Sequence, residues 1–206
     1  MSARFVTEIG FGLEAGAWGG SVALDGARCV RVADGRVISI RRASQGDEQF
    51  MQRFVGSLSA HSRYQRFFHP LRELTPSMLE RMVQPDDTHG AVLLALAGPV
   101  HAEVVGLAQY DVVEPGQAEV AVIVGESWRR VGLGTRLLRE LEVLAAGAGI
   151  VEAHADILRE NPAALALLQQ MGYVVDTSAR DLYTLHVVKR MMLPSRYSSR
   201  QALQRR

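Results

Sequence analysis

The stretch AEVAVIVGESWRRVGLGT, residues 118–135, decides the fold of this chain. It opens with an apolar run, Ala118–Val124, which is typical of a buried strand and is interrupted by a single acid, Glu119. A turn follows, and then Gly132 and Gly134 at the start of a long helical pattern. The free N–H groups and the dipole of a helix N-terminus attract anions, and glycines let an anion approach the backbone. The stretch therefore predicts a strand, a turn and a helix that together form an anion site.

Two common nucleotide-binding loops do not fit this stretch. A dinucleotide fingerprint needs a third glycine three residues after Gly134, where Leu137 stands. A Walker loop needs a lysine, and Lys189 is the only lysine among the 23 lysine and arginine residues. Arg129 and Arg130 add positive charge just before the glycines. The loop is therefore predicted to bind a pyrophosphate group, but as a loop of a kind different from these two.

Apolar periodicity along the rest of the chain predicts one domain, with a mixed sheet and helices on both of its faces. The predicted strands are Val37–Arg42, Ala91–Ala97, Glu103–Asp111, Ala118–Val124, Val151–Ile157, Tyr173–Val175 and Leu182–Val188. The predicted helices are Asp47–Leu58, Ala60–Phe67, Gly132–Ala146, Asn161–Met171 and one that opens at Thr75-Pro76. Ser44, three residues before Asp47, is predicted to form a capping box at the first helix.

The two ends of the chain differ from the middle. Residues 1–36 are rich in glycine and predict an irregular arm that ends in a hairpin with its turn at Asp34-Gly35. Residues 189–206 carry six basic side chains and no acid. This tail is either a solvated segment or an arm that docks on an acidic partner or on a second subunit of a homodimer.

The composition excludes several classes of protein. The 22 acidic residues nearly balance the basic ones, and a net charge of +1 gives no support for a nucleic-acid partner. No apolar run is long enough to span a bilayer, and no signal peptide is evident, so we expect no membrane contact and a cytoplasmic location. The single cysteine, Cys29, excludes an internal disulfide and a cysteine zinc site, and no metal is predicted.

Two blocks of sequence resemble the GNAT superfamily of N-acetyltransferases. Arg129-x-x-Gly132-x-Gly134 is similar to the family's Arg/Gln-x-x-Gly-x-Gly/Ala signature, and Asn161-x-x-Ala164 with Met171-Gly172-Tyr173 resembles its second signature. Upstream, Ile38–Arg42 and the sequence Ser-Arg-Tyr-Gln-Arg-Phe-Phe at residues 62–68 resemble the acetyltransferase module of bacterial protein-lysine acetyltransferases. The resemblance covers residues 37–188.

This resemblance implies a GNAT fold, with a mostly antiparallel central sheet of six to seven strands, and acetyl-CoA as the cofactor. In the family, the pantetheine arm lies between two splayed strands, which correspond here to Ala118–Val124 and Val151–Ile157. The backbone groups expected to bind the pantetheine belong to Val122, Ile123 and Val124. Those expected around the pyrophosphate belong to Arg129, Arg130, Val131, Gly132, Leu133, Gly134 and Thr135. Asn161 is expected either beside the cofactor or simply as a helix N-cap.

Glu119 is the candidate catalytic residue. A lysine amine has a reference pKa of about 10.4, so an enzyme that acylates it at neutral pH must remove a proton. A carboxylate in an otherwise apolar strand is costly unless it has a task, and the resemblance implies that the task is general-base catalysis. The alternative is a structural residue paired with a nearby arginine. Many family members have a tyrosine in the second signature that acts as the acid for the leaving thiolate. The matching position in this chain is Leu168.

The predicted function is the transfer of an acetyl group from acetyl-CoA to a primary amine, most readily a protein lysine. A small-molecule amine, such as a polyamine, an antibiotic or an amino acid, is the first alternative. A non-catalytic regulatory protein that binds acyl-CoA is the second. His101 and His154 are predicted to be ordinary half-buried histidines rather than catalytic ones.

Overall fold

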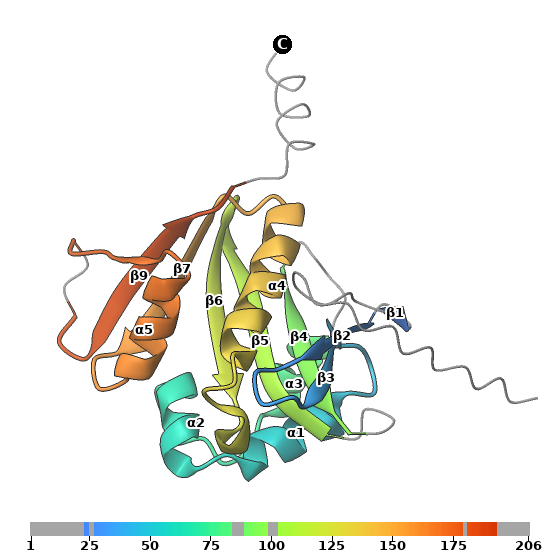
Figure 1. Cartoon of the computed structure of the whole chain (residues 1–206). Helices are drawn as coiled ribbons and strands as arrows, with labels where there is room; N and C mark the ends of the chain where they lie inside the picture. Colours follow the sequence, from blue (N-terminus) through green and yellow to red (C-terminus); the bar gives the residue numbers. More distant parts are fainter. Residues whose placement is uncertain (1–22, 25–26, 84–88, 99–102, 179–180, 193–206) are drawn as a thin grey trace, which may run out of the picture.

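A single sheet with the strand order β1-β2-β3-β4-β5-β6-β7-β9-β8 runs through the computed structural model, which describes residues 23–24, 27–83, 89–98, 103–178 and 181–192 (Figure 1). The strands are β1 (Ala23–Leu24), β2 (Ala27–Arg31), β3 (Val37–Arg42), β4 (Gly90–Ala97), β5 (Glu103–Glu114), β6 (Gln117–Val124), β7 (Glu152–Leu158), β8 (Val174–Val175) and β9 (Thr184–Arg190). The helices are α1 (Glu48–Ser57), α2 (Ala60–Phe67), α3 (Pro76–Val83), α4 (Leu133–Gly147) and α5 (Pro162–Gln170), with one 3₁₀ turn, η1 (Glu126–Trp128).

All neighbouring strands in the described part of the chain are antiparallel except β6 and β7, which are parallel. The prediction of a mixed, mostly antiparallel sheet is therefore confirmed, but the predicted six to seven strands are too few, because the described sheet has nine. The two additional strands, β1 and β2, come from the N-terminal segment. β1 is too short to show apolar alternation, and β2 is the strand that the predicted hairpin at Asp34-Gly35 implied without giving its bounds.

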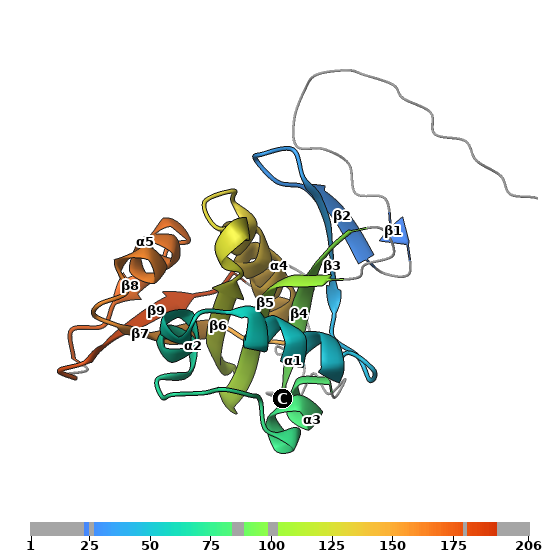
Figure 2. The same ribbon diagram turned by 90° about the horizontal axis from the view of Figure 1, so that it is seen from below.

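Two helical layers cover the two faces of the sheet, as predicted. Figure 2 shows α4 and α5 on one side of the sheet and α1, α2 and α3 on the other. Even-numbered residues of β6 such as Val120 pack with α4, whereas Ile123 packs with α1 and α3. Because side chains alternate along a strand, Glu119 lies on the same face as Ile123, which is the face that α2 covers.

The hairpin between β2 and β3 has a three-residue loop, Ala33-Asp34-Gly35. The N–H of Gly35 donates to the carbonyl of Val32 at 2.9 Å, and Gly35 has a φ of 90°. These features define a turn followed by a glycine bulge, one of the common hairpin connections. The predicted hairpin is present, and its loop includes Ala33 as well as the predicted Asp34-Gly35.

The predicted capping box at Ser44 is wrong in its details. Helix α1 begins at Glu48 after the N-cap residue Asp47, so Ser44 lies outside the helix. The carboxylate of Asp47 accepts hydrogen bonds from the backbone N–H of Ser44 at 2.8 Å and from Arg41 at 2.7 Å. Burial raises the pKa of Asp47, but the hydrogen bonds from Arg41 and Ser44 outweigh it and lower the pKa overall. The sequence pattern could not show that the side chain of Asp47 pairs with Arg41 and does not cap the helix.

Across the residues that the structure describes, no helix is both long enough and apolar enough to cross a membrane.

Candidate active site

The parallel strands β6 and β7 pair over only three residues each. Gln117–Glu119 lies opposite Glu152–His154, and beyond these residues the two strands separate. A cavity of about 590 Å³ opens where they part. This volume is typical of sites that bind small molecules and cofactors.

The cavity is lined by elements from both faces of the sheet. Helix α2 and its C-cap residue Phe68 line the cavity from one face, and α4 and α5 contribute Leu138 and Leu168 from the other. The residues of α2 are Ser62, Gln65 and Arg66. The space between the parted strands therefore connects the two faces.

The structure brings almost all of the predicted site residues to this one cavity. Those that line it are Glu119, Val122, Ile123, Val124, Arg129, Arg130, Gly132, Leu133, Gly134, Thr135 and Asn161. Val131 does not line the cavity. Glu119 and Asn161 are 42 positions apart in the sequence. They meet at this cavity because the crossover through α4 brings the chain back beside β6.

The loop before α4 has the backbone geometry of an anion site. Gly132, the N-cap of α4, has a φ of 83°, and Arg130 has a φ of 61° although it carries a side chain. The first backbone hydrogen bond of α4 runs from the N–H of Arg136 to the carbonyl of Gly132. The N–H groups of Leu133, Gly134 and Thr135 therefore lie in the part of the helix that has no partner within it. With the helix dipole, these donors suit a phosphate group.

Asn161 has the structural role of an N-cap. Its side-chain oxygen accepts a hydrogen bond from the N–H of Ala164 at 3.1 Å, which satisfies one free donor of α5. The same residue lines the cavity. Of the two roles predicted for Asn161, the cap is observed, and contact with the cofactor remains a prediction.

A hydrogen-bond network on α2, which the sequence did not suggest, holds the loop from one side. The hydroxyl of Ser62 donates to the carboxylate of Glu126 at 2.5 Å and accepts from the guanidinium of Arg129 at 2.8 Å. Arg129 also donates to the carbonyl of Val124 at 3.2 Å, and Glu126 accepts from the N–H of Ser59 at 3.1 Å. Arg129 thus links α2, the end of β6 and the loop.

Glu126 carries its negative charge throughout the physiological pH range. Burial raises the pKa of Glu126, but the hydrogen bonds from Ser62 and Ser59 outweigh this effect and lower it to about 2. The contribution of this network to folding stability is therefore complete above a pH of about 4.5, the ordinary value for glutamate, and is lost as the pH falls toward 2.

Glu119 lies at the last position where β6 and β7 still pair. Its partner across the β6–β7 pair is His154, and its partner on the other side, on β5, is Asp111. Its side chain is exposed rather than buried among apolar groups, because the strands part immediately after it. The carboxylate therefore faces the cavity without the burial cost that the apolar strand suggested.

Arg66, which the sequence analysis did not single out as a site residue, stands near this carboxylate. Its Nε is inaccessible to solvent and has no hydrogen-bond partner, while the side chain stacks on Phe67 at 5.0 Å. Burial lowers the pKa of Arg66, and the carboxylates of Asp111 and Glu119 act in the opposite direction. Arg66 thus places a positive charge beside Glu119 on the face of α2. The only feature of the sequence that pointed to Arg66 was its place in the motif at residues 62–68.

The other candidates lie in ordinary surroundings. His154 is half-buried, as predicted, and its ring centroid is 5.3 Å from that of His186, whose Nδ1 lies 2.8 Å from Asp156. His101 lies outside the described residues. Leu168 is buried and lines the cavity.

Comparison with known proteins decides the family. The model of the Acetyltransferase (GNAT) family matches residues 58–173, more than half of the chain. This chain belongs to the GNAT family. It is also 27% identical over 165 residues to Acetyltransferase PA5475 of Pseudomonas aeruginosa, a match that covers 78% of this chain and 86% of the relative.

Solved structures share the fold of this GNAT chain. The GNAT domain of S. lividans PAT matches with a TM-score of 0.75 and 23% identity, over 82% of this chain and 99% of that domain. The spermidine N-acetyltransferase from Vibrio cholerae, solved in complex with CoA and spermine, matches with a TM-score of 0.60 and 14% identity. That match covers 75% of this chain and 95% of the Vibrio enzyme.

This GNAT chain is an acetyl-CoA-dependent N-acyltransferase, and the cavity fits its cofactor. Free N–H donors and glycines at the start of α4 suit the pyrophosphate, and the unpaired edge of β6 suits the amide groups of pantetheine. A side chain at Gly134 would reduce this space, since an added Cβ would lie 3.2 Å from Cδ2 of Leu167 and 3.7 Å from Cγ2 of Val124.

Substitution of Gly134 tests this placement of the pyrophosphate. In Gly134→Asp, the added carboxylate fills the space and repels the phosphates, so we expect the Kd for CoA to rise by about 100-fold, or about 2.8 kcal/mol. Gly134→Ala is the matched control, because it meets Leu167 in the same way but adds no charge. Calorimetry with CoA measures both variants. Equal affinities in Gly134→Asp and the wild type would show that the phosphates bind elsewhere.

Proposed function

We propose that this enzyme acetylates the ε-amino groups of protein lysines, with Glu119 as the general base. The observation that carries the proposal is the position of Glu119, exposed in the cavity where β6 and β7 part. This is the point at which a group that enters from the face of α2 meets a cofactor held at the start of α4.

The chemistry needs a proton acceptor at this point. Acetyl-CoA supplies the acetyl thioester. At neutral pH a lysine amine with a pKa of about 10.4 is almost entirely protonated, so it is not nucleophilic until a proton is removed. Glu119 accepts that proton first, and the neutral amine then attacks the thioester carbonyl. The N–C bond forms, the C–S bond breaks, and the second proton of the nitrogen passes to the departing thiolate of CoA.

The electrostatic surroundings of Glu119 support this role. Arg66 places a positive charge near Glu119, and Asp111 lies directly opposite Glu119 on β5. Asp156 also lines the cavity, so the acceptor side carries carboxylates that attract an ammonium group before it is deprotonated.

Two aromatic side chains on α2 favour an acceptor attached to a large molecule. Tyr64 lies on α2 and Phe68 is the C-cap residue of the same helix, and the two are 38% and 39% exposed. Phe68 lines the cavity and holds a φ of 60°, a strained conformation that is concentrated at functional sites. An exposed aromatic rim of this kind is typical of a surface that contacts another protein.

A small polyamine is the second candidate acceptor. The carboxylates of Glu119 and Asp156 along one cavity would suit a ligand with more than one positive charge. The shared fold with a spermidine N-acetyltransferase is consistent with this alternative.

The variant Glu119→Gln tests the proposed base. The amide keeps the shape of the side chain but cannot accept the proton, so we expect kcat to fall by about 10²- to 10⁴-fold while the Kd for CoA is unchanged. The remaining rate should rise with pH, because the fraction of free amine grows. Glu114→Gln, at the exposed end of β5 and away from the cavity, is the matched control and should keep full activity. Wild-type turnover in folded Glu119→Gln would remove this residue from the mechanism.

Isotope-labelled acetyl-CoA tests the proposed acceptor. The enzyme is incubated with intact cell proteins and with a panel of small amines, and mass spectrometry locates the label. We expect it on lysine ε-amines of proteins, and not in parallel samples with Glu119→Gln. Self-acetylation adds little background, because the only lysine, Lys189, is held by Glu142 at 2.7 Å. Label confined to polyamines would favour the second candidate, and no label on any protein or amine of the panel would overturn both proposed acceptors.

A further inference from the structure

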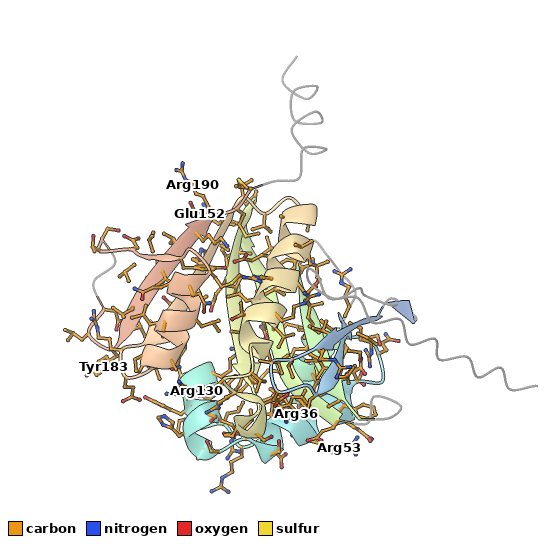
Figure 3. The ribbon with its side chains drawn as sticks, viewed as in Figure 1. Arg36, Arg53, Arg130, Glu152, Tyr183 and Arg190 are labelled. Carbon is orange, nitrogen blue, oxygen red and sulfur yellow. The ribbon has the colours of Figure 1, made fainter. Side chains whose placement is uncertain are left out.

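The loop of the β2–β3 hairpin lies against the cofactor loop, although the two are about 95 residues apart in the sequence (Figures 1 and 2). The backbone N–H of Ala33 donates to the carbonyl of Val131 at 3.1 Å. The guanidinium of Arg36 donates to the carbonyl of Ser127 at 2.9 Å, and its central carbon lies 3.7 Å from the ring centroid of Trp128. In the view of Figure 3, Arg36 and Arg130 lie on the two sides of this loop.

Arg36 is held in this orientation by its own hairpin. Its Nε donates to the carboxylate of Asp34 at 2.7 Å, and the same carboxylate accepts from the backbone N–H of Arg36 at 3.1 Å. These hydrogen bonds lower the pKa of Asp34, so the pair is charged at neutral pH. The guanidinium therefore reaches Ser127 and Trp128 from a fixed position rather than from a free side chain.

These contacts determine where the N–H groups of the cofactor loop point. A trans peptide is planar, so its C=O and N–H point in opposite directions. Since the hairpin holds the carbonyl of Val131, the N–H of Gly132 must point away from the hairpin, and Gly132 lines the cavity. The same loop contains Arg130 in a left-handed conformation, which is unfavourable for a residue with a side chain and needs support from its neighbours.

We propose that the hairpin loop, residues 33–36, is a positioning element for acetyl-CoA. Through the N–H of Ala33 and the side chain of Arg36, it holds residues 127–132 in the conformation that presents their N–H groups to the pyrophosphate. The inference rests on the proposed place of the cofactor at this loop. The hairpin lies outside residues 58–173, the part of the chain that the family model matches.

The variant Ala33→Pro removes one of the two contacts and little else. Among the described residues, Phe68 and Arg130 are the only non-glycine residues with a positive φ, so φ is negative at Ala33 and Asp34, as a type I turn requires. Proline is favoured at the first central position of such a turn, and it follows an extended residue readily. It lacks only the N–H that donates to Val131. Ala33→Ser keeps this donor and is the matched control.

The expected result for Ala33→Pro is a rise of roughly 3- to 10-fold in the KM for acetyl-CoA and in the Kd for CoA. The kcat at saturating acetyl-CoA should stay at the wild-type value, because the hairpin touches neither Glu119 nor the acceptor wall. Thermal unfolding should show an unchanged or higher midpoint, since proline at a compatible position stabilises the fold.

The variant Arg36→Ala removes the second contact. We expect a rise of roughly 5- to 30-fold in the same two constants, again with kcat unchanged, and a smaller rise in Arg36→Lys. Arg53→Ala is the charge control, because Arg53 stacks on Phe50 of its own helix, α1, at 4.8 Å and does not line the cavity. This control should bind CoA like the wild type.

Calorimetry with CoA needs no acceptor, so the result does not depend on which amine the enzyme acetylates. If Gly134→Asp binds CoA normally, the assignment of the loop itself is wrong. If Gly134→Asp loses affinity, a wild-type Kd in either folded hairpin variant would overturn the positioning role, as would a fall in kcat with an unchanged Kd.

Discussion

The separation of β6 from β7 is the constraint on which the rest of the site depends. Each strand keeps one fully paired edge, since β6 pairs with β5 over eight residue pairs and β7 with β9 over seven. Their shared edge has only three pairs. Backbone groups beyond that point need other partners, and a ligand with amide groups of its own can supply them. We propose that the cofactor binds to the same backbone groups that would otherwise complete the sheet.

This separation also explains how two substrates meet. The cavity passes between the strands and is lined from both faces of the sheet. In the proposed function, acetyl-CoA at the start of α4 and an amine that arrives along α2 would therefore approach one another from opposite faces. Glu119 stands at the end of the paired segment, where both can be reached. The cofactor loop is supported from two sides, by Ser62 of α2 through Arg129 and by the β2–β3 hairpin through Arg36.

Local sequence signals were sufficient for the elements that carry the cofactor. Glycines at 132 and 134, a helical pattern after them and the Asn161-Pro162 start of α5 are features of short range, and all were found where predicted. The signals failed where the contacts are distant in sequence. Ser62 and Arg66 meet the cavity only because α2 crosses the sheet there, and Arg36 meets Trp128 through the fold alone. The motif at residues 62–68 contains Ser62 and Arg66 but does not show what they contact, and the contact of Arg36 leaves no pattern in the chain.

The most direct test of this account is a crystal structure of the enzyme with CoA bound. The account predicts that the pyrophosphate accepts hydrogen bonds from N–H groups of residues 129–135 and that the pantetheine arm runs beside Val122–Val124. The thiol should then lie between the parted strands, within reach of an amine at Glu119. A complex in which CoA binds outside this cavity, or in which β6 and β7 close together over their full length, would contradict it.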